Sequence, residues 1–366
     1  MTSPSSLKWT RLLPSSSSSS GNNASPLPRS SHGVSYLKKG DRLVIYGGEN
    51  VARTPIVEAG QECWIIDHIL TAENACESLQ WRAVRCSTSP PARVAHAQAV
   101  HNDDEIYIFG GRAGISMQER AMNDLWKLSG SPGEETWTKI EGITGDIPEA
   151  RSFHRMICIG DALYVFGGCG ETSGRLADLH KFDISSRKWT NLGTSSHLRG
   201  RGGPNVLPLN KGHQIGIVAG FCGEESNDGH VYNLKTNQWE SEALTPQLEG
   251  LRPRSVCISA SFPSVGVSLI FGGEVDPSAK GHEGAGGFEH DIVLLDEATG
   301  KYLTSIPGES KNKTSITLYP QQRGWSDGAS VDHGNGTATL LLFGGLSGDD
   351  TTPQRLDDLW RLDLIK

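Results

Sequence analysis

The stretch Ile108-Phe109-Gly110-Gly111 decides the fold, because an apolar run that ends in a glycine pair recurs along the chain. Four other copies are clear and one is degenerate, at a spacing of about 50 to 70 residues. These copies are Ile45-Tyr46-Gly47-Gly48, Val165-Phe166-Gly167-Gly168, the degenerate Ile217-Val218-Ala219-Gly220, Ile270-Phe271-Gly272-Gly273 and Leu342-Phe343-Gly344-Gly345. A repeat of this length indicates six similar structural units.

Each unit continues in the same order after its glycine pair. A loop is followed by an Asp-rich strand, such as Asn123-Asp124-Leu125-Trp126, and then by a strand with an aromatic residue. Those aromatic residues are Trp81, Trp137, Trp189, Trp239 and, in the fifth unit, Tyr302. This order resembles the kelch repeat, which implies an all-β, six-bladed propeller whose blades are four-stranded antiparallel meanders. We expect residues 1–366 to form this single domain.

The two ends of the chain predict how the ring closes. The sixth unit stops at Trp360-Arg361-Leu362-Asp363-Leu364, without an outer strand, whereas the chain begins with the unassigned strand Leu7-Lys8-Trp9-Thr10. We expect the N-terminal strand to complete the last blade, which removes an exposed sheet edge. The serine-rich segment, 14–27, is predicted to be a flexible loop between that strand and the first blade.

Composition limits the classes of partner. The 366 residues carry a net charge of −8, which argues against a broad surface for nucleic acid or anionic membranes. Residues 1–6 lack the basic and apolar regions of a secretory signal, so we expect none, and no apolar segment is long enough to span a bilayer. Seven cysteines without a C-x-x-C pair indicate free thiols in a reducing cytosolic or nuclear compartment.

Each unit places one arginine, in the same phase, in the loop that leads into its innermost strand. In a four-stranded meander, this loop shares a face with the loop after the second strand. We therefore expect six guanidiniums around the mouth of the central channel. Either they bind an anionic ligand through their planar forks, or they brace neighbouring loops through backbone carbonyls. The six are Arg29, Arg93, Arg151, Arg201, Arg254 and Arg323.

The loop after the second strand of the fifth unit is the candidate metal site. It runs from Glu274 to Phe288 and contains Glu274, Asp276 and His282 among many glycines. Oxygen and imidazole donors without a thiolate suit Fe(II), Mn(II) or Zn(II), with positions left open for substrate. The alternative is an ordered loop in which Asp276 and His282 only form turns and caps.

Trp325 is the candidate wall of a ligand pocket. It follows Arg323 by two residues, on what we expect to be an innermost strand. An aromatic wall beside arginines suits a ligand with an apolar side chain and an anionic head. The alternative is that Trp325 only packs the channel.

Over nearly the whole chain, the sequence resembles the nitrile-specifier, epithiospecifier and thiocyanate-forming proteins. The matching stretches are Arg151-Ser-Phe-His, Arg201-Gly-Gly, Gly220-Phe-Cys-Gly, Phe271-Gly-Gly-Glu274-Val, Gly281-His282-Glu-Gly-Ala-Gly and Arg323-Gly-Trp325-Ser. The resemblance implies a ferrous ion that engages the sulfur of a glucosinolate aglucone and directs its breakdown to nitriles or related products.

The resemblance also implies roles for single residues. It assigns Glu274 and His282 to iron, Arg93 and Arg151 to the substrate sulfate, and Trp325 to the pocket wall. The family's metal motif is Glu, three residues, Asp, three residues, His, whereas this chain has Ser278 at the middle position.

Two functions from different classes follow. The first is an iron-dependent, lyase-like protein for an anionic, sulfur-containing small molecule, with Glu274, His282 and Trp325 at its catalytic centre. The second is a protein-interaction propeller without catalysis, in which the same loops bind a partner protein.

Overall fold

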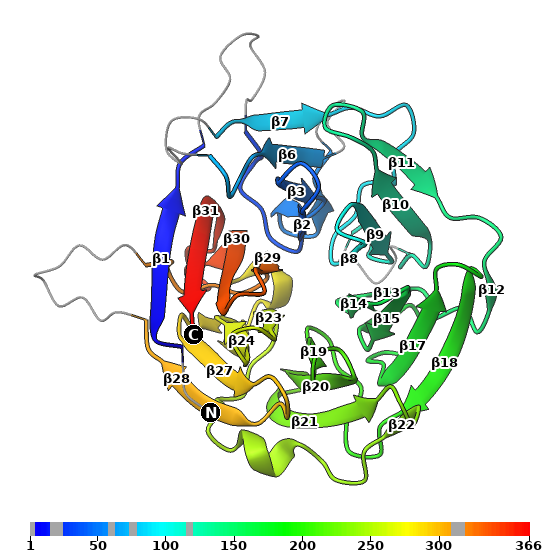
Figure 1. The fold of residues 1–366 in the computed structure, drawn as a ribbon, viewed down its shortest axis with the longest axis vertical. Coiled ribbons are helices and arrows are strands. Elements are labelled where there is room, and N and C mark those ends of the chain that lie inside the picture. Colours follow the sequence, from blue (N-terminus) through cyan, green and yellow to red (C-terminus); the bar gives the residue numbers. More distant parts are fainter. Residues whose placement is uncertain (1–3, 15–24, 58–62, 73–78, 115–119, 309–318) are drawn as a thin grey trace, which may run out of the picture.

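In the computed structural model, six antiparallel β-meanders surround a central axis, so the predicted all-β six-bladed propeller is confirmed (Figure 1). The structure describes residues 4–14, 25–57, 63–72, 79–114, 120–308 and 319–366. Most of the predicted flexible loop, 14–27, lies outside these ranges. Within them, no helix has the length and apolar character needed to cross a membrane.

The first three blades follow one another along the chain. Blade one contains β2 (Gly33–Leu37), β3 (Arg42–Tyr46), β6 (Cys63–Asp67) and β7 (Trp81–Val84), with the hairpin β4 (Glu49–Val51) and β5 (Thr54–Pro55). Blade two contains β8 (Ala97–His101), β9 (Glu105–Phe109), β10 (Leu125–Ser129) and β11 (Thr136–Lys139). Blade three contains β14 (Arg155–Ile159), β15 (Ala162–Phe166), β17 (Asp178–Asp183) and β18 (Lys188–Thr194), with the short strands β12 (Thr144–Gly145), β13 (Arg151–Ser152) and β16 (Cys169–Gly170).

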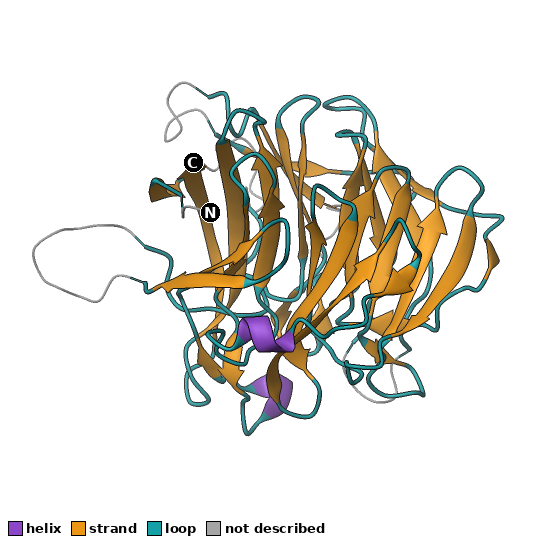
Figure 2. Cartoon of the chain, turned by 60° about the horizontal axis from the view of Figure 1, so that its bottom comes forward, coloured by secondary structure: helices purple, strands orange, loops and turns teal. Residues whose placement is uncertain are grey.

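The other three blades complete the ring. Blade four contains β19 (Asn205–Leu209), β20 (Gln214–Phe221), β21 (Glu225–Asn233) and β22 (Gln238–Trp239), followed by the 3-10 helix η1 (Thr245–Leu248). Blade five contains β23 (Ile258–Phe262), β24 (Val267–Phe271), β27 (Ile292–Asp296) and β28 (Tyr302–Ile306), with β25 (Glu274–Asp276), η2 (Gly281–Glu283) and β26 (Gly287–Phe288) in one loop. Blade six contains β29 (Asp327–Asp332), β30 (Thr337–Ser347), β31 (Gln354–Ile365) and β1 (Ser6–Leu12). The two helices lie on the same side of the molecule (Figure 2).

The N-terminal strand closes the ring as predicted. β1 pairs antiparallel with β31 from Ser6 opposite Ile365 to Leu12 opposite Leu359. Trp9 is buried in this blade, with its ring 5.0 Å from Phe271 of blade five. The first and last strands therefore stabilise the same blade and its contact with a neighbour.

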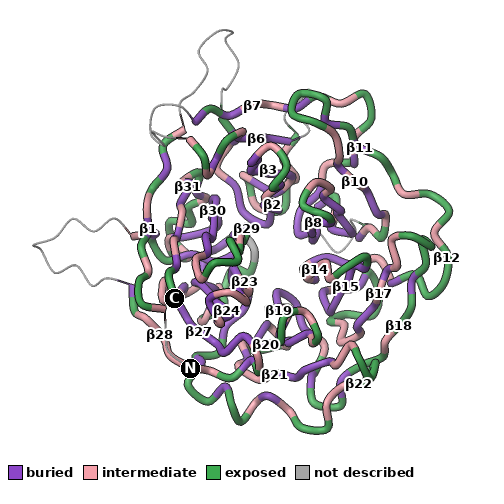
Figure 3. The backbone as a smooth tube through the Cα atoms, in the orientation of Figure 1, coloured by how far each residue is buried: buried purple, intermediate pink, exposed green. Residues whose placement is uncertain are grey.

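Apolar residues fill the spaces between adjacent blades. In one such cluster, Trp189 of blade three lies 5.2 Å from Phe109 of blade two. Buried stretches follow the strands in every blade, whereas exposed stretches concentrate at turns (Figure 3). Trp189 therefore packs between two adjacent blades.

A closed ring of backbone hydrogen bonds surrounds the channel mouth. One residue per blade, two positions after the repeat arginine, has a φ between 48° and 57°. Its N–H donates to the carbonyl of the equivalent residue in the preceding blade, over 2.8 to 3.0 Å. The six residues are Ser31, Ala95, Phe153, Gly203, Val256 and Trp325. Trp325 therefore lies in a turn at the mouth. The prediction that it lies on an innermost strand was wrong, because β29 begins only at Asp327.

Below this ring, an ion pair crosses the channel. Arg155 of β14 donates to the carbonyl of Cys257 over 2.6 Å and lies 3.4 Å from Asp327 of β29. The other oxygen of Asp327 accepts from the N–H of Val34 in blade one, over 2.8 Å. These bonds connect four blades and separate the mouth from a cavity of about 680 Å³ lined by the innermost strands.

Candidate functional site at the channel mouth

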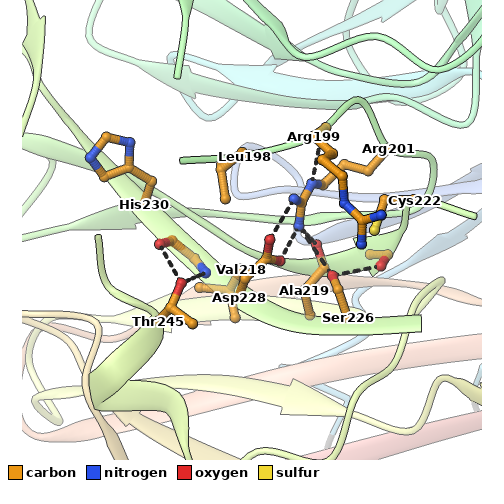
Figure 4. Close-up of polar contacts among 12 residues, drawn as sticks. Leu198, Arg199, Arg201, Val218, Ala219, Cys222, Ser226, Asp228, His230 and Thr245 are labelled. Carbon is orange, nitrogen blue, oxygen red and sulfur yellow. Dashed lines mark hydrogen bonds and ion pairs between the residues drawn. The ribbon is translucent and has the colours of Figure 1, made fainter. Parts of the chain in front are cut away.

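The repeat arginines are buried braces within the blades. Arg201 is fully buried, and its guanidinium forms a two-pronged pair with Asp228 of β21 (Figure 4). It also donates to the carbonyls of Arg199 and Ala219 over 3.0 Å each. This arrangement connects the turn before the innermost strand, the end of the second strand and the start of the third strand of one blade.

Four other arginines repeat this geometry with an aspartate in, or directly before, the third strand of their blade. The pairs are Arg93 with Asp124, Arg151 with Asp178, Arg254 with Asp291 and Arg323 with Asp358. Although burial acts to raise it, hydrogen bonds from Arg151 and His180 hold the pKa of Asp178 below its usual range. Arg29, also buried, donates to the carbonyls of Leu27 and Gly47 over 3.0 Å each.

These contacts favour the bracing alternative over an anion site made by the six guanidiniums. The six side chains are at most 2% exposed, so their charges face their own blades. The physical reason is that an uncompensated buried cation is costly, and an in-phase aspartate compensates it in five blades. The bracing alternative describes the contacts seen, including those of Arg93 and Arg151.

A pocket of about 290 Å³ lies at the mouth, beside the ring of backbone hydrogen bonds. Glu274 and Ser278 of the blade-five loop line it together with Trp325. The ring of Trp325 meets Phe153 edge to face, with 5.5 Å between the ring centres. The expectation that loops after second strands meet loops before innermost strands is therefore fulfilled here.

Glu274 is the buried acid of this pocket. It begins β25, directly after the glycine pair, and its backbone forms a bridge with Ser255. The residue is 7% exposed. Burial raises the pKa of Glu274 to about 7, Asp350 adds to the rise, and the N–H groups of Ser278 and Gly286 oppose it. A proton or a cation can therefore stabilise this carboxylate.

Glu49 occupies the equivalent position in blade one, where its carboxylate has compensating partners. Its carboxylate lies 3.3 Å from the guanidinium of Arg355 and accepts from the N–H of Arg53 over 2.7 Å. It also accepts from the hydroxyl of Ser30 over 3.3 Å. Glu274 has no such cation among the described residues. The same backbone position thus holds a compensated acid in one blade and an uncompensated one in the other.

Of the other two candidate metal ligands, only Asp276 has a described side chain. Asp276 is 75% exposed and lies 3.4 Å from Arg252, and the pocket lining does not include it. His282 belongs to η2, and its side chain is outside the described part of the structure. Among the side chains that are described, no group of three His, Cys, Asp or Glu residues is close enough to hold a metal.

The carboxylate of Asp350 lies beside Ser278, the residue at the middle position of the metal motif. Ser278 donates its hydroxyl to one oxygen of Asp350, and the N–H of Ala279 donates to the other over 3.1 Å. Asp350 comes from the blade-six loop and acts on the pKa of Glu274. Carboxylate oxygens from Glu274 and Asp350 fit the donors that a ferrous ion accepts.

Several pocket residues escaped sequence reasoning. Cys169 and Phe221 follow the glycine positions of their blades, just as Glu274 does, and Arg175 reaches the pocket from the blade-three loop. Burial raises the pKa of the Cys169 thiol, which remains neutral. The shared position after the glycine pair was a signal for Cys169 and Phe221, whereas no repeat position marks Arg175.

Glu225 lies next to this pocket and also escaped notice. It accepts from the hydroxyl of Ser255 over 3.1 Å, and its second carboxylate oxygen is buried without a partner in the described structure. Burial, with smaller contributions from Glu274 and Asp276, raises the pKa of Glu225 to about 8.

Known proteins share this architecture over most of the chain. The N-(sulfonatooxy)prop-2-enimidothioate sulfolyase of Thlaspi arvense is 27% identical over 357 residues, which are 92% of each protein. Adagio protein 3 of Arabidopsis thaliana is also 27% identical, over 87% of this chain but 48% of its own length. This chain therefore spans about half of that relative.

A solved structure, that of YjhT, shares the fold with a TM-score of 0.65 at 17% identity, over 92% of this chain and 95% of the other. The model of the KLHDC2/KLHL20/DRC7 Kelch-repeats domain matches residues 68–273, more than half of the chain. On this match and on its six kelch blades, the chain belongs to the KLHDC2/KLHL20/DRC7 Kelch-repeats domain family.

Proposed function

We propose that this protein is a specifier-type lyase that binds Fe(II) and an anionic, sulfur-containing small molecule at the mouth pocket and directs the breakdown of that molecule. The observation that carries the proposal is the buried Glu274 carboxylate, which has no ion-pair partner among the described residues and lies at a pocket walled by aromatic rings. The name of the Thlaspi arvense relative, a sulfolyase for a sulfonatooxy imidothioate, supports this substrate class.

In this proposal, Glu274, Asp350 and His282 hold the iron. Bound Fe(II) supplies a Lewis-acid or one-electron partner for sulfur. Trp325 and Phe153 provide the apolar wall that orients the substrate side chain and excludes water from it. Asp276 has no part in the iron site, because it faces Arg252 and solvent.

Anaerobic metal analysis of the Glu274→Gln variant tests the iron site. We expect stoichiometric Fe(II) in the wild type and its loss in Glu274→Gln, because the amide cannot offer a charged oxygen. Glu283→Gln is the matched control, since Glu283 lies in the same loop with its side chain 66% exposed. Product analysis with a sulfonatooxy imidothioate should show iron-dependent products only where iron binds. Equal iron content in Glu274→Gln and the wild type would refute this role for Glu274.

The second candidate function is a protein-interaction propeller. The Adagio relatives favour it, since in them the matched region is about half of a longer protein. In that case the same mouth loops bind a partner protein. Absence of iron in the wild type, together with unchanged products, would make this function the leading account.

A further inference from the structure

Arg175 reaches the mouth pocket from a tight hairpin in blade three. The N–H of Gly170 donates to the carbonyl of Gly174 over 2.7 Å, and Cys169 forms a bridge with Arg175. Glu149 accepts from the N–H of Thr172 at the tip of this hairpin, over 3.0 Å. The hairpin is thus held at both its base and its tip, and Arg175 leaves it next to the pocket.

The guanidinium of Arg175 is the cation of the pocket. Its carbon lies 4.5 Å from the centre of the Phe221 ring, which orients the planar group by cation–π stacking. In the described part of the chain, this guanidinium forms no hydrogen bond and no ion pair. Its N–H donors are therefore available to a bound molecule.

Other arginines near the mouth already have partners. Arg155 is paired with Asp327, Arg252 with Glu289, and Arg355 with Glu49. Arg112 donates to the hydroxyl of Ser152 over 2.8 Å. Arg93 and Arg151, to which the resemblance assigned the sulfate, are buried against aspartates. Anion recognition at this mouth consequently needs a different residue from those in the repeat.

We propose that Arg175 binds the anionic head group of the molecule that occupies the mouth pocket. The inference rests on the proposed function for its substrate class, a sulfated small molecule. The apolar part of that molecule lies against Trp325 and Phe153, and its sulfur end faces Glu274. A guanidinium suits this task because its planar fork matches two sulfate oxygens.

Calorimetry with benzyl sulfate, in the absence of iron, tests the proposal directly. We expect Arg175→Gln to weaken binding about tenfold, as for the loss of hydrogen bonds to a charged group. Arg175→Lys should recover part of that loss, because it keeps the charge without the planar fork. Arg187→Gln is the control, since Arg187 lies in the turn between β17 and β18, on the opposite face, and should bind as the wild type does.

Salt and a neutral probe sharpen the test. Raising the salt from about 0.1 M to about 1 M should weaken binding to the wild type and leave Arg175→Gln nearly unchanged, since screening acts on the charge pair. Benzyl alcohol should not distinguish the two proteins.

Two outcomes overturn the inference: equal affinity of Arg175→Gln and wild type for benzyl sulfate, or no binding by the wild type. Because this assay needs neither iron nor turnover, it separates the inference from the proposed function. An Arg175-dependent affinity, with iron unaffected by Glu274→Gln, would leave the anion site in place and refute the iron role.

Discussion

Replacing Asp178 with asparagine tests whether the repeat arginines brace the blades or bind a ligand. Arg151 is fully buried, and each of its terminal nitrogens lies 2.8 Å from an oxygen of Asp178. Asparagine keeps the shape of the side chain but leaves a buried cation without its counter-charge. Breaking a buried pair in this way costs about 3 to 5 kcal/mol.

Replacing the arginine of the same pair should cost less free energy of unfolding. Arg151→Met removes the cation and leaves the carboxylate of Asp178, which is 20% exposed and still accepts from His180 over 2.8 Å. Water can reach that carboxylate, so its loss of a partner is partly compensated. The structure therefore predicts a larger loss of stability for Asp178→Asn than for Arg151→Met.

Thermal unfolding of both variants and of the double variant measures these costs. An unfolding entropy of about 2.1 cal/mol/K per residue gives about 0.8 kcal/mol/K for a ring that unfolds as one unit. A loss of about 4 kcal/mol then lowers Tm by about 5 °C. The double variant should lose less than the sum of the single variants, because the two side chains form one pair.

Binding of benzyl sulfate to Arg151→Met distinguishes a structural brace from a ligand-binding residue. A structural brace leaves affinity close to that of the wild type at temperatures where the variant is folded. An unchanged Tm combined with a loss of affinity of tenfold or more would refute the bracing role and return Arg151 to the ligand site.

Three other substitutions test separate parts of the structure. Glu225→Gln should raise stability increasingly as the pH rises. Because the pKa of Glu225 is raised to about 8 in the folded protein, its protonation stabilises the fold fully below the ordinary pKa of a glutamate, and this stabilisation is lost as the pH rises to about 8. We expect a gain of up to about 5 kcal/mol near pH 9, at about 1.4 kcal/mol for each unit by which the pKa is raised. The gain is measured as Tm against pH, and no pH-dependent gain would contradict this assignment. Trp9→Ala should cost about 3 to 5 kcal/mol in chemical unfolding, because it empties the contact with Phe271; wild-type stability would mean that β1 does not close the ring. Gly202→Val should weaken benzyl sulfate binding, because its methyl groups enter the pocket. Tm should change little, because a Cβ at this position has only ordinary contacts, the nearest 3.5 Å from Cys169. Unchanged affinity would place the bound molecule elsewhere.

The repeat made most of the fold predictable, because every blade repeats the same local chemistry. The glycine pairs, the aromatic outer strands and the unassigned strand around Trp9 identified six blades and their closure, and the structure confirms both. The aspartate partners of five of the six buried arginines were also in the sequence. Asp124, Asp178 and their equivalents recur in or directly before the third strands, in the same phase as the arginines, and a buried guanidinium requires such a partner.

Contacts between loops of different blades could not be predicted, because they leave no periodic pattern in the sequence. The hydrogen bonds from the Ser278 segment to Asp350 join blades five and six, and the stacking of Arg175 on Phe221 joins blades three and four. Each of these residues occurs once in the chain at its position, so no comparison between repeats could reveal it. The sequence located Glu274 and Trp325 correctly at one mouth, but not the residues that complete the pocket around them.

The location of the pocket follows from side chains that blade four lacks. The residue after the repeat arginine is serine or valine in four blades and glycine, Gly324, in blade six. Blade four alone has two consecutive glycines there, Gly202 and its member of the backbone ring, Gly203. Both line the pocket, which is therefore open where two consecutive positions carry no side chain. The backbone bonds that close the ring are the same in all six blades, so they do not distinguish one part of the mouth from another. Binding specificity must then arise from the side chains around this gap. Among the described residues that line it, Glu274 and Arg175 are an acid and a base without an ion-pair partner.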